Sequence, residues 1–465
     1  MRRTKIICTI GPVTGSYDML SKMYAAGMDV VRLNMSHGDH ASHAKVIQSI
    51  KTLNKQVRFP VPIVLDTQGP EIRTGNLAED LELKEGDTIS ISVRPEDVEK
   101  TSFNINYVEL IDALNIGDKI TVDNGLINLE VLSKEDRIMQ CKVLDGGRLK
   151  SKRHVNLPGI RVNLPSLTAK DKEDILFAIQ QELDFIALSF VREAKDIREL
   201  KSFLGSKADK IKIIAKIEDQ EGLKNLDEII EEADAIMVAR GDLGVEINIE
   251  DLPNVQRKIV RKCHQRGKRV IVATHLLESM IENPIPTRAE VTDVANAVYE
   301  GVDAVMLSGE TTIGKHPIKC IEHLDKIALK SEKIPGLEFQ TLLEKSTDKQ
   351  HLAASAVDLA EALEVKGIVV ITRRGLMANL VTNCRPFKTK IYAFTNDSRT
   401  RRQLSLNKAV VPHRLAFSKD PEKTLASAMA VLVEQEGLKS EDKIVVISDV
   451  IAGLGIDAIQ IRRIP

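Results

Sequence analysis

The sequence of 465 residues contains no tryptophan, only 3% aromatic residues and a formal net charge of −1. Proteins that bind single-stranded nucleic acid stack bases on aromatic side chains and attract phosphates with a basic surface. A net charge near zero also gives no field that would draw the chain to an anionic membrane. We therefore expect neither nucleic acid nor a membrane as a partner, and any anion must be recognised locally.

Cysteine and long apolar runs are scarce as well. The five cysteines are widely separated and form no CxxC pair, which argues against a disulfide framework and against a zinc site. The first residues, MRRTKIICTIGP, contain an apolar run of only about six residues, which is shorter than that of a signal peptide. No run of about 18 apolar residues predicts a membrane span. Together these absences predict a cytoplasmic protein.

What the sequence has instead is a regular alternation of short β-type runs with helical patterns. Eight runs rich in Val and Ile cover residues 4–10, 29–35, 62–66, 184–190, 212–218, 234–240, 269–274 and 303–308. Eight β-α units are the repeat number of a TIM barrel, whose strands are covered on their outer face. The predicted fold class is therefore α/β, built on a TIM (β/α)8 barrel.

Two further units accompany the predicted barrel. Residues 71–164 contain only β-type runs separated by Gly-containing turns, which predicts a small all-β lid above the carboxyl ends of the strands. An insertion without a role is the alternative. After a charged stretch, strands and helices alternate again, which predicts a doubly wound α/β domain. The expected domains are 1–70 (barrel, first part), 71–164 (lid), 165–336 (barrel, second part) and 337–465 (C-terminal domain).

One lysine and two acids are expected to meet at neighbouring strand ends. Lys216 and Glu218 are two residues apart in a strand, so their side chains lie on the same face. The next strand ends near Asp242, at the barrel face where such folds place their chemistry. Two carboxylates that leave coordination positions free for substrate suit Mg²⁺ or Mn²⁺. On these residues alone, a buried ion pair between Lys216 and Glu218 is as well supported as catalysis.

Other polar residues stand at the ends of the second and third strands. Arg32, Asn34 and Ser36 are spaced by two and share one face, where Arg suits phosphate and the Asn and Ser oxygens suit a hard cation. A helix cap is the alternative. At the third strand end, a constrained Gly-Pro turn is surrounded by Asp66, Thr67, Glu71 and Arg73.

Hydroxyl groups follow the seventh and eighth strands. Thr274, Ser308 and Glu310 could hold water or pass a proton there, although capping of the next helix is an equal alternative for the hydroxyls. Three histidines with a spacing of three follow the second strand, and they are His37, His40 and His43. Because the segment after them is polar and helical, we predict a solvated helix face and no metal site.

Nine motifs in chain order resemble the pyruvate kinase family. They are ICTIGP, RLNMSHG, LDTQGPEIRTG, VNLPG, AKIEDQEG, MVARGDLGVE, ATHLLESM, PTRAEVTDVANAV and MLSGET. The similarity covers the barrel and its insertion nearly throughout and continues more weakly in the tail. It implies phosphoryl transfer from phosphoenolpyruvate to ADP, the last step of glycolysis, with Mg²⁺ (or Mn²⁺) and K⁺ as cofactors.

The resemblance also implies residue roles. Lys216 would stabilise the transferring phosphoryl group and the enolate oxygen, while Glu218 and Asp242 would hold Mg²⁺. Gly241 and Thr274 would meet the substrate carboxylate. The remaining implied roles are phosphate clamps for Arg32 and Arg73, K⁺ ligands for Asn34, Ser36, Asp66 and Thr67, and nucleotide contacts for Asn34, His37, Arg73 and Arg153.

Some positions bear on the expected K⁺ dependence and on the nucleotide contacts, because they match or depart from the family pattern. Glu71 stands where members that require K⁺ carry Glu rather than Lys, so we predict K⁺ dependence. Departures at Gln68, His275, Lys150 and His154 leave the nucleotide contacts of the lid open.

The tail also departs from the family. The loop that binds sugar phosphate in many members appears here as TRRGLMA (372–378) without its two hydroxyls, and the loop at 448–460 differs too. We therefore do not expect fructose bisphosphate, although Arg373 and Arg374 could bind another phosphorylated effector or lie free in solvent. The resemblance suggests a homotetramer. A phosphoenolpyruvate- or pyruvate-using lyase on the same barrel and a non-catalytic metabolite sensor are the competing functions.

Overall fold

Eight parallel strands close into the predicted barrel in the computed structural model, which describes residues 2–94, 102–123, 125–135, 137–160, 162, 164–448 and 458–465. Their order around the barrel is β1 (Lys5–Thr9), β16 (Ala304–Leu307), β15 (Arg269–Ala273), β14 (Ala235–Ala239), β13 (Lys212–Ile217), β12 (Phe185–Leu188), β3 (Ile63–Asp66) and β2 (Val30–Asn34). Alternate residues of each strand fill the barrel interior, as Ile7 does, or pack under the helices, as Ile6 does. This explains why the strands are continuous apolar runs.

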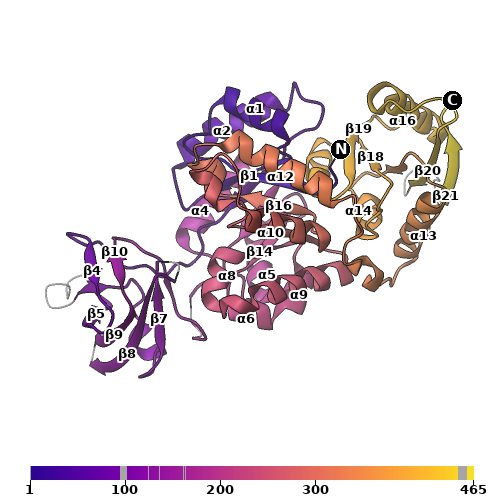
Figure 1. Cartoon of the computed structure of the whole chain (residues 1–465). Helices are drawn as coiled ribbons and strands as arrows, with labels where there is room; N and C mark the ends of the chain where they lie inside the picture. The colour runs from indigo at the N-terminus through magenta and orange to yellow at the C-terminus, as the bar shows by residue number, and fades with distance from the viewer. Residues whose placement is uncertain are drawn as a thin grey trace.

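Helices cover the outside of the barrel (Figure 1). They are α1 (Tyr17–Ala26), α2 (His40–Leu53), α4 (Ala169–Gln180), α5 (Ala194–Leu204), α6 (Gln220–Lys224), α7 (Leu226–Glu232), α8 (Arg240–Glu246), α9 (Leu252–Gln265), α10 (Arg288–Tyr299), α11 (Gly309–Thr312) and α12 (Pro317–Ser331). Short 3-10 turns are η2 (Gly205–Lys207), η3 (Ile249–Asp251) and η4 (Glu278–Ile281).

Two details of these helices go beyond the sequence pattern. The helical pattern over residues 222–233 is divided into α6 and α7 at Asn225, whose side chain donates to the backbone oxygen of Arg192 at 2.9 Å. The face with the histidines, predicted to be solvated, is so only in part, because His37 is exposed and the His40 side chain is 43% exposed. His43 is buried and its Nε2 lies 2.9 Å from the backbone oxygen of His37, while His40 stacks on Phe177.

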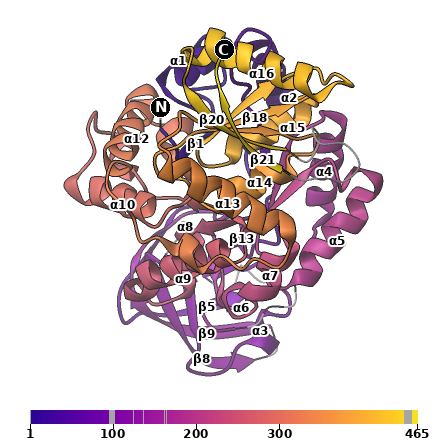
Figure 2. The same cartoon turned by 90° about the vertical axis from the view of Figure 1, so that its right-hand side faces the viewer.

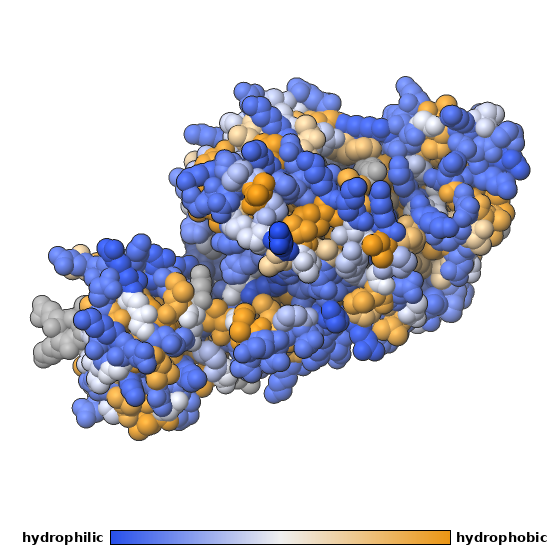
Figure 3. Space-filling view, viewed as in Figure 1, coloured by the Kyte–Doolittle hydropathy of each residue, from blue (hydrophilic) through white to orange (hydrophobic). Residues whose placement is uncertain are grey.

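The insertion after β3 forms an all-β unit with its own apolar core. One six-stranded sheet has the order β11 (Val155–Asn156), β7 (Lys119–Val122), β8 (Ile127–Glu135), β9 (Ile138–Asp145), β5 (Thr88–Ser92) and β6 (Phe103–Asn104). A second sheet pairs β10 (Gly147–Leu149) with β4 (Leu81–Leu83), and one short helix is α3 (Leu110–Ala113). Figure 3 shows this unit projecting from the barrel, with hydrophilic and hydrophobic residues interspersed on its visible surface.

The C-terminal unit is the predicted doubly wound domain. Its sheet has the order β19 (Val410–Arg414), β18 (Ile391–Thr395), β17 (Ile368–Ile371), β20 (Lys443–Ser448) and β21 (Ala458–Arg463), with β21 antiparallel to β20. Helices α13 (Asp348–Ala362) and α14 (Leu376–Asn383) pack on one face, and α16 (Pro421–Glu436) packs on the other. The remaining elements are α15 (Ser398–Gln403), η5 (Phe339–Leu342) and η6 (Leu404–Leu406). Strand β19 contains Pro412, which a strand tolerates at a sheet edge, where β19 lies.

This C-terminal domain docks on the amino-terminal face of the barrel strands (Figures 1 and 2). Arg385 pairs with Asp303, just before β16, at 2.6 Å, and Arg402 pairs with Asp184, just before β12, at 2.8 Å. The opposite face, where the strands end, is therefore left for the lid and the site. Among the described residues, no helix is both long and apolar enough to cross a membrane.

Candidate active site

Lys216 is the centre of a charged cluster at the mouth of the barrel. Its Nζ lies 2.9 Å from Oε1 of Glu218 and 3.2 Å from Oδ1 of Asp66, and it donates to Oγ of Ser189 at 2.7 Å. Burial favours the neutral amine, but the carboxylates of Asp66 and Glu218 outweigh burial and raise the pKa of Lys216. Ser189 was missed at the sequence level, although its place directly after β12 was a usable signal.

Two carboxyl groups beside Lys216 form the candidate metal site. Burial, opposed by Lys216 and reinforced by Asp242, raises the pKa of Glu218 to about 7. Burial, opposed by Lys216 and reinforced by Glu71, also raises the pKa of Asp242. A divalent cation would stabilise both groups in their charged form, so the residues fit Mg²⁺ or Mn²⁺.

No group of three or more His, Cys, Asp and Glu residues with metal-binding geometry occurs in the described part of the chain. A site made of two carboxylates leaves coordination positions of a divalent cation free for substrate oxygens and water.

The ends of β2 and β3 bring the other predicted residues together. Arg32 Nε lies 2.5 Å from Oδ2 of Asp66, and the Asn34 side chain accepts the backbone N–H of Ser36 at 3.1 Å. Burial favours protonation of Asp66, but Arg32 and Lys216 outweigh burial and lower the pKa of this carboxyl. Asp66 is thus a buried anion between two cations. Ser36 does not cap α2, whose cap is Asp39.

The turn after β3 is constrained as expected. Gly69 has a φ of +74°, and a Cβ at this position would lie 2.8 Å from the side chains of Phe190 and Ser189. Thr67 is buried, and its Oγ1 accepts the backbone N–H of Ser189 at 3.1 Å. Only glycine allows the loops after β3 and β12 to approach this closely.

Thr274 and Gly241 lie side by side after β15 and β14. The N–H of Gly241 donates to Oγ1 of Thr274 at 2.7 Å, and Arg240 donates to the backbone oxygen of Thr274 at 2.7 Å. Arg240 is in turn paired with Asp293 at 2.8 Å. Thr274 has a φ of +66°, a strained conformation for a β-branched residue that persists because these contacts impose it.

Neither hydroxyl after the last two strands caps a helix. The turn that follows Thr274 begins at Glu278 with Leu277 before it, and Ser308 makes no side-chain cap to α11. Ser308 Oγ is buried without a hydrogen-bond partner in the described residues. The carboxylate of Glu310 accepts the N–H groups of Ser308 at 2.7 Å and Leu277 at 3.0 Å, which joins the two loops.

The candidate nucleotide residues are more scattered. Arg73 Nε lies 2.6 Å from Oε2 of Glu71 at the start of the insertion, and Arg153 Nη1 lies 3.4 Å from Oδ1 of Asp123 within it. His37 is exposed beyond β2. Arg73 is therefore held at the base of the insertion, where it also donates to the backbone oxygen of Lys152 at 2.8 Å, and Arg153 faces its own unit.

The all-β unit reaches the barrel through the chain segment around β11. His154 Nδ1 lies 3.5 Å from Oδ1 of Asp242, and Asn156 donates to Oε1 of Glu246 at 2.9 Å. Burial lowers the pKa of His154. The contact with Asp242 was not foreseen, because only the departure from glycine at His154 marked this position.

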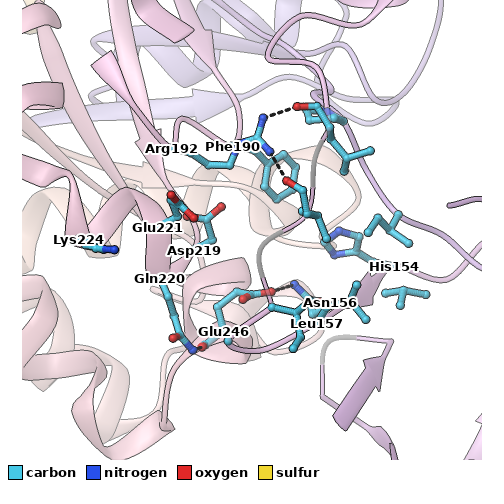
Figure 4. Close-up of a pocket in the computed structure, with 17 residues that line it drawn as sticks. His154, Asn156, Leu157, Phe190, Arg192, Asp219, Gln220, Glu221, Lys224 and Glu246 are labelled. Atoms are coloured by element: carbon cyan, nitrogen blue, oxygen red, sulfur yellow. Dashed lines mark hydrogen bonds between the residues drawn. The ribbon is translucent and has the colours of Figure 1, made fainter. Parts of the chain in front are cut away.

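A cavity of about 410 Å³, whose lining side chains are drawn in Figure 4, lies beside the charged cluster. It is lined by the segment after β11 and by barrel loops that carry Arg192, Asp219 and Glu246, with His154 between the cavity and the cluster. Arg192 Nη1 donates to the backbone oxygen of Val162 at 2.9 Å and fixes the returning chain. Lys216 and Glu218 do not line this cavity.

Comparison with known proteins decides the family. The family model of the pyruvate kinase barrel domain matches residues 1–321, and that of the pyruvate kinase alpha/beta domain matches residues 350–461. This chain belongs to the pyruvate kinase family. It is therefore a phosphotransferase, and the lyase and sensor alternatives are set aside.

Individual family members match over most of their length. Pyruvate kinase isozyme G, chloroplastic, of Nicotiana tabacum is 44% identical over 443 residues, which are 94% of this chain and 78% of that protein. Pyruvate kinase of Geobacillus stearothermophilus is 43% identical over 462 residues, which are 97% of this chain and 78% of that protein. The family thus includes plastidial and bacterial proteins.

Proposed function

We propose that this chain transfers the phosphoryl group of phosphoenolpyruvate to ADP and yields pyruvate and ATP. The observation that carries the proposal is the position of Lys216, a buried cation between the carboxylates of Asp66 and Glu218 at the barrel mouth. Phosphoryl transfer needs little covalent work from a protein, which must position two substrates and neutralise their oxygens. Lys216 would face the moving phosphoryl group.

Two cations complete the proposed site. Glu218 and Asp242 would hold Mg²⁺ or Mn²⁺, which supplies positive charge to the phosphate and enolate oxygens when bound. A K⁺ ion would take oxygens from Asn34, Ser36, Asp66 and Thr67. Because Asp66 already pairs with Arg32 and Lys216, K⁺ would share this carboxylate with them.

The remaining residues would bind the substrates. The backbone N–H of Gly241 and the hydroxyl of Thr274 would meet the substrate carboxylate, and Arg32 and Arg73 would hold phosphates. The nucleotide would contact Asn34, His37, Arg73 and Arg153. Closure of the all-β unit over the mouth would bring Arg153 to it.

An Asp242→Asn variant tests the proposal, with Asp219→Asn as a matched control. Asp219 follows Glu218 directly, but its carboxylate accepts the N–H of Gly222 at 2.7 Å and starts α6. ATP formation from phosphoenolpyruvate and ADP, and Mn²⁺ binding, should both fall strongly in Asp242→Asn and stay near the parent values in Asp219→Asn. Equal effects of the two substitutions, or no ATP formation by the parent chain, would refute the assignment.

We further propose a cytoplasmic homotetramer with the domain limits 1–70, 71–164, 165–336 and 337–465, in which the C-terminal domain binds a phosphorylated effector. Arg373 and Arg374 are exposed, which suits either an effector or free solvation. In the second expected effector loop, residues 448–460, positions 449–457 lie outside the described residues. A screen of phosphorylated metabolites by activity would identify the effector.

A further inference from the structure

His275 is an exposed residue at the mouth of the barrel. Strand β15 ends at Ala273, so His275 lies on the face where the barrel strands end, directly after Thr274. Its side chain is exposed, whereas Leu276 and Leu277 after it are buried. Among the residues that the structure describes, the imidazole has no hydrogen-bond or ion-pair partner. Both of its ring nitrogens are therefore available to a ligand.

The backbone of His275 is strained. Its φ is +54°, and the φ of Thr274 before it is +66°, so two successive residues occupy the left-handed region. Such conformations cost free energy in residues with a Cβ, and they cluster at catalytic sites and ligand clamps. The contact from Arg240 explains the conformation of Thr274, but no hydrogen bond of the His275 side chain within the described chain explains its own. The strain therefore indicates a role for His275 other than holding the loop together.

The ring of His275 borders a small space beside Gly241. A Cβ placed on Gly241 would lie 3.7 Å from Cε1 of His275 and 3.5 Å from Oγ1 of Thr274, which are ordinary van der Waals distances. A side chain at this position would thus point into a space between the imidazole and the threonine hydroxyl. Since Gly241 has no side chain, this space is left to a ligand. Because Cε1 is bonded to both Nδ1 and Nε2, either ring nitrogen lies next to it.

The two groups proposed for the substrate carboxylate are already engaged within the chain. The N–H of Gly241 donates to Oγ1 of Thr274 at 2.7 Å, and this hydroxyl donates to the backbone oxygen of Ala273 at 2.7 Å. An ionised carboxylate only accepts hydrogen bonds, at about four positions, so it needs donors that are free. A ring N–H of His275 is such a donor.

We propose that His275 binds the carboxylate of phosphoenolpyruvate by donating a ring N–H to one of its oxygens, beside Gly241 and Thr274. The inference rests on the proposed function, which places this carboxylate there, and it adds a residue that determines specificity for a carboxylate substrate. The carboxylate is present both in the bound substrate and in the transition state. An interaction of equal strength in the two states changes KM and leaves kcat unaltered, so His275 acts on binding rather than on phosphoryl transfer.

Two measurements on the full chain with Mn²⁺ test the proposal, namely calorimetric titration with phosphoenolpyruvate and steady-state formation of ATP. His275→Ala should weaken phosphoenolpyruvate binding and raise its KM by about tenfold or more, the value of one hydrogen bond to a charged group. The KM for ADP and the unfolding temperature should stay near those of the parent chain. His275→Gly should have the same effect as His275→Ala, because both lack the ring, although only glycine is unstrained at a positive φ.

The matched control is His351→Ala. His351 is also exposed, but it lies on α13 of the C-terminal domain, away from the mouth. This variant should keep the parent KM for both substrates. His275→Gln retains an amide N–H donor and should keep part of the affinity that His275→Ala loses.

The outcomes separate this inference from the proposed function. Weaker phosphoenolpyruvate binding in both His275→Ala and His275→Gly, with an unchanged KM for ADP, supports the role of His275. An unchanged affinity for phosphoenolpyruvate, an equal rise in both KM values, or a loss in His275→Ala that His275→Gly does not share overturns it, as does a parent chain without saturable binding. A parent chain that binds phosphoenolpyruvate but forms no ATP refutes the proposed function, and the calorimetric comparison still decides the role of His275.

Discussion

Replacement of Lys216 decides whether this residue acts on the phosphoryl group or only balances buried charge. Methionine has a side chain of similar length without the ammonium group, so Lys216→Met leaves Asp66 and Glu218 as two buried carboxylates without their shared cation. Removal of one partner from a buried ion pair destabilises a protein by about 3–5 kcal/mol. Loss of a cation that stabilises the transition state lowers turnover on the order of 10³-fold, about 4 kcal/mol.

The two effects are similar in size but appear in different measurements. Lys216→Arg keeps a positive charge against both carboxylates, so its unfolding temperature should stay closer to that of the parent chain than that of Lys216→Met. The planar guanidinium places its charge differently from an ammonium group, so turnover should still fall by about 10²-fold or more. Mn²⁺ should still bind to both variants, because Glu218 and Asp242 remain.

The assay is ATP formation at saturating substrates, with thermal unfolding measured on the same samples. Lys201→Met is the control, because Lys201 is also ion-paired, at 3.2 Å from Glu232, but lies on α5 away from the mouth. A folded Lys216→Met protein that keeps more than about a tenth of the parent turnover would contradict the reasoning. Full activity in Lys216→Arg would show that charge balance alone is required.

Three further predictions concern pH, the strained threonine and K⁺. Burial raises the pKa of Glu246 to about 7, so its contribution to stability is complete below the unfolded pKa of about 4.3 and is lost as the pH rises through 7. Glu246→Gln should therefore stabilise by about 2–3 kcal/mol at pH 8 and much less at pH 5, and equal shifts in unfolding temperature would contradict this. Thr274→Ala should lower turnover about tenfold or more, whereas Thr274→Ser should keep the turnover of the parent chain. Turnover is measured as pyruvate formation and as uptake of deuterium from the solvent into pyruvate. Equal rates in the two variants would exclude a role for the hydroxyl. Activity should fall to a small fraction in K⁺-free buffer and return with added KCl but not with tetramethylammonium chloride, since Glu71 supplies no positive charge; full activity without K⁺ would refute the dependence.

The barrel and the centre of its site were predictable because both follow from short-range patterns. Alternation along a strand places Lys216 and Glu218 on one face, and eight β-α units make neighbouring strand ends converge. Their side chains do meet, with Asp66 as the third member. This pattern could not decide whether Lys216 and Glu218 form only a buried ion pair or take part in catalysis, because the same contacts occur in both cases.

Contacts between distant segments were not predictable. Nothing local indicates that His154 of the insertion approaches Asp242, or that Arg240 holds the backbone of Thr274. Pro412 in β19 is a related case, because an edge position makes proline acceptable in a strand and only the assembled sheet shows which strand lies at the edge.

Strand direction gives a further criterion for sorting the buried acids of this chain. Asp184 and Asp303 stand directly before β12 and β16, at the amino-terminal face, and each is bound by an arginine of the C-terminal domain. Asp66 and Glu218 stand at the ends of β3 and β13, at the mouth, and share Lys216. All four carboxyl groups are buried, so neither their burial nor their residue type distinguishes an acid that joins domains from one at the site. Because every barrel strand runs in the same direction, the two acids before a strand lie at the face that the C-terminal domain covers, and the two acids at a strand end lie at the open mouth. The same direction places Arg269, the first residue of β15, at the domain interface, 3.6 Å from Asp303.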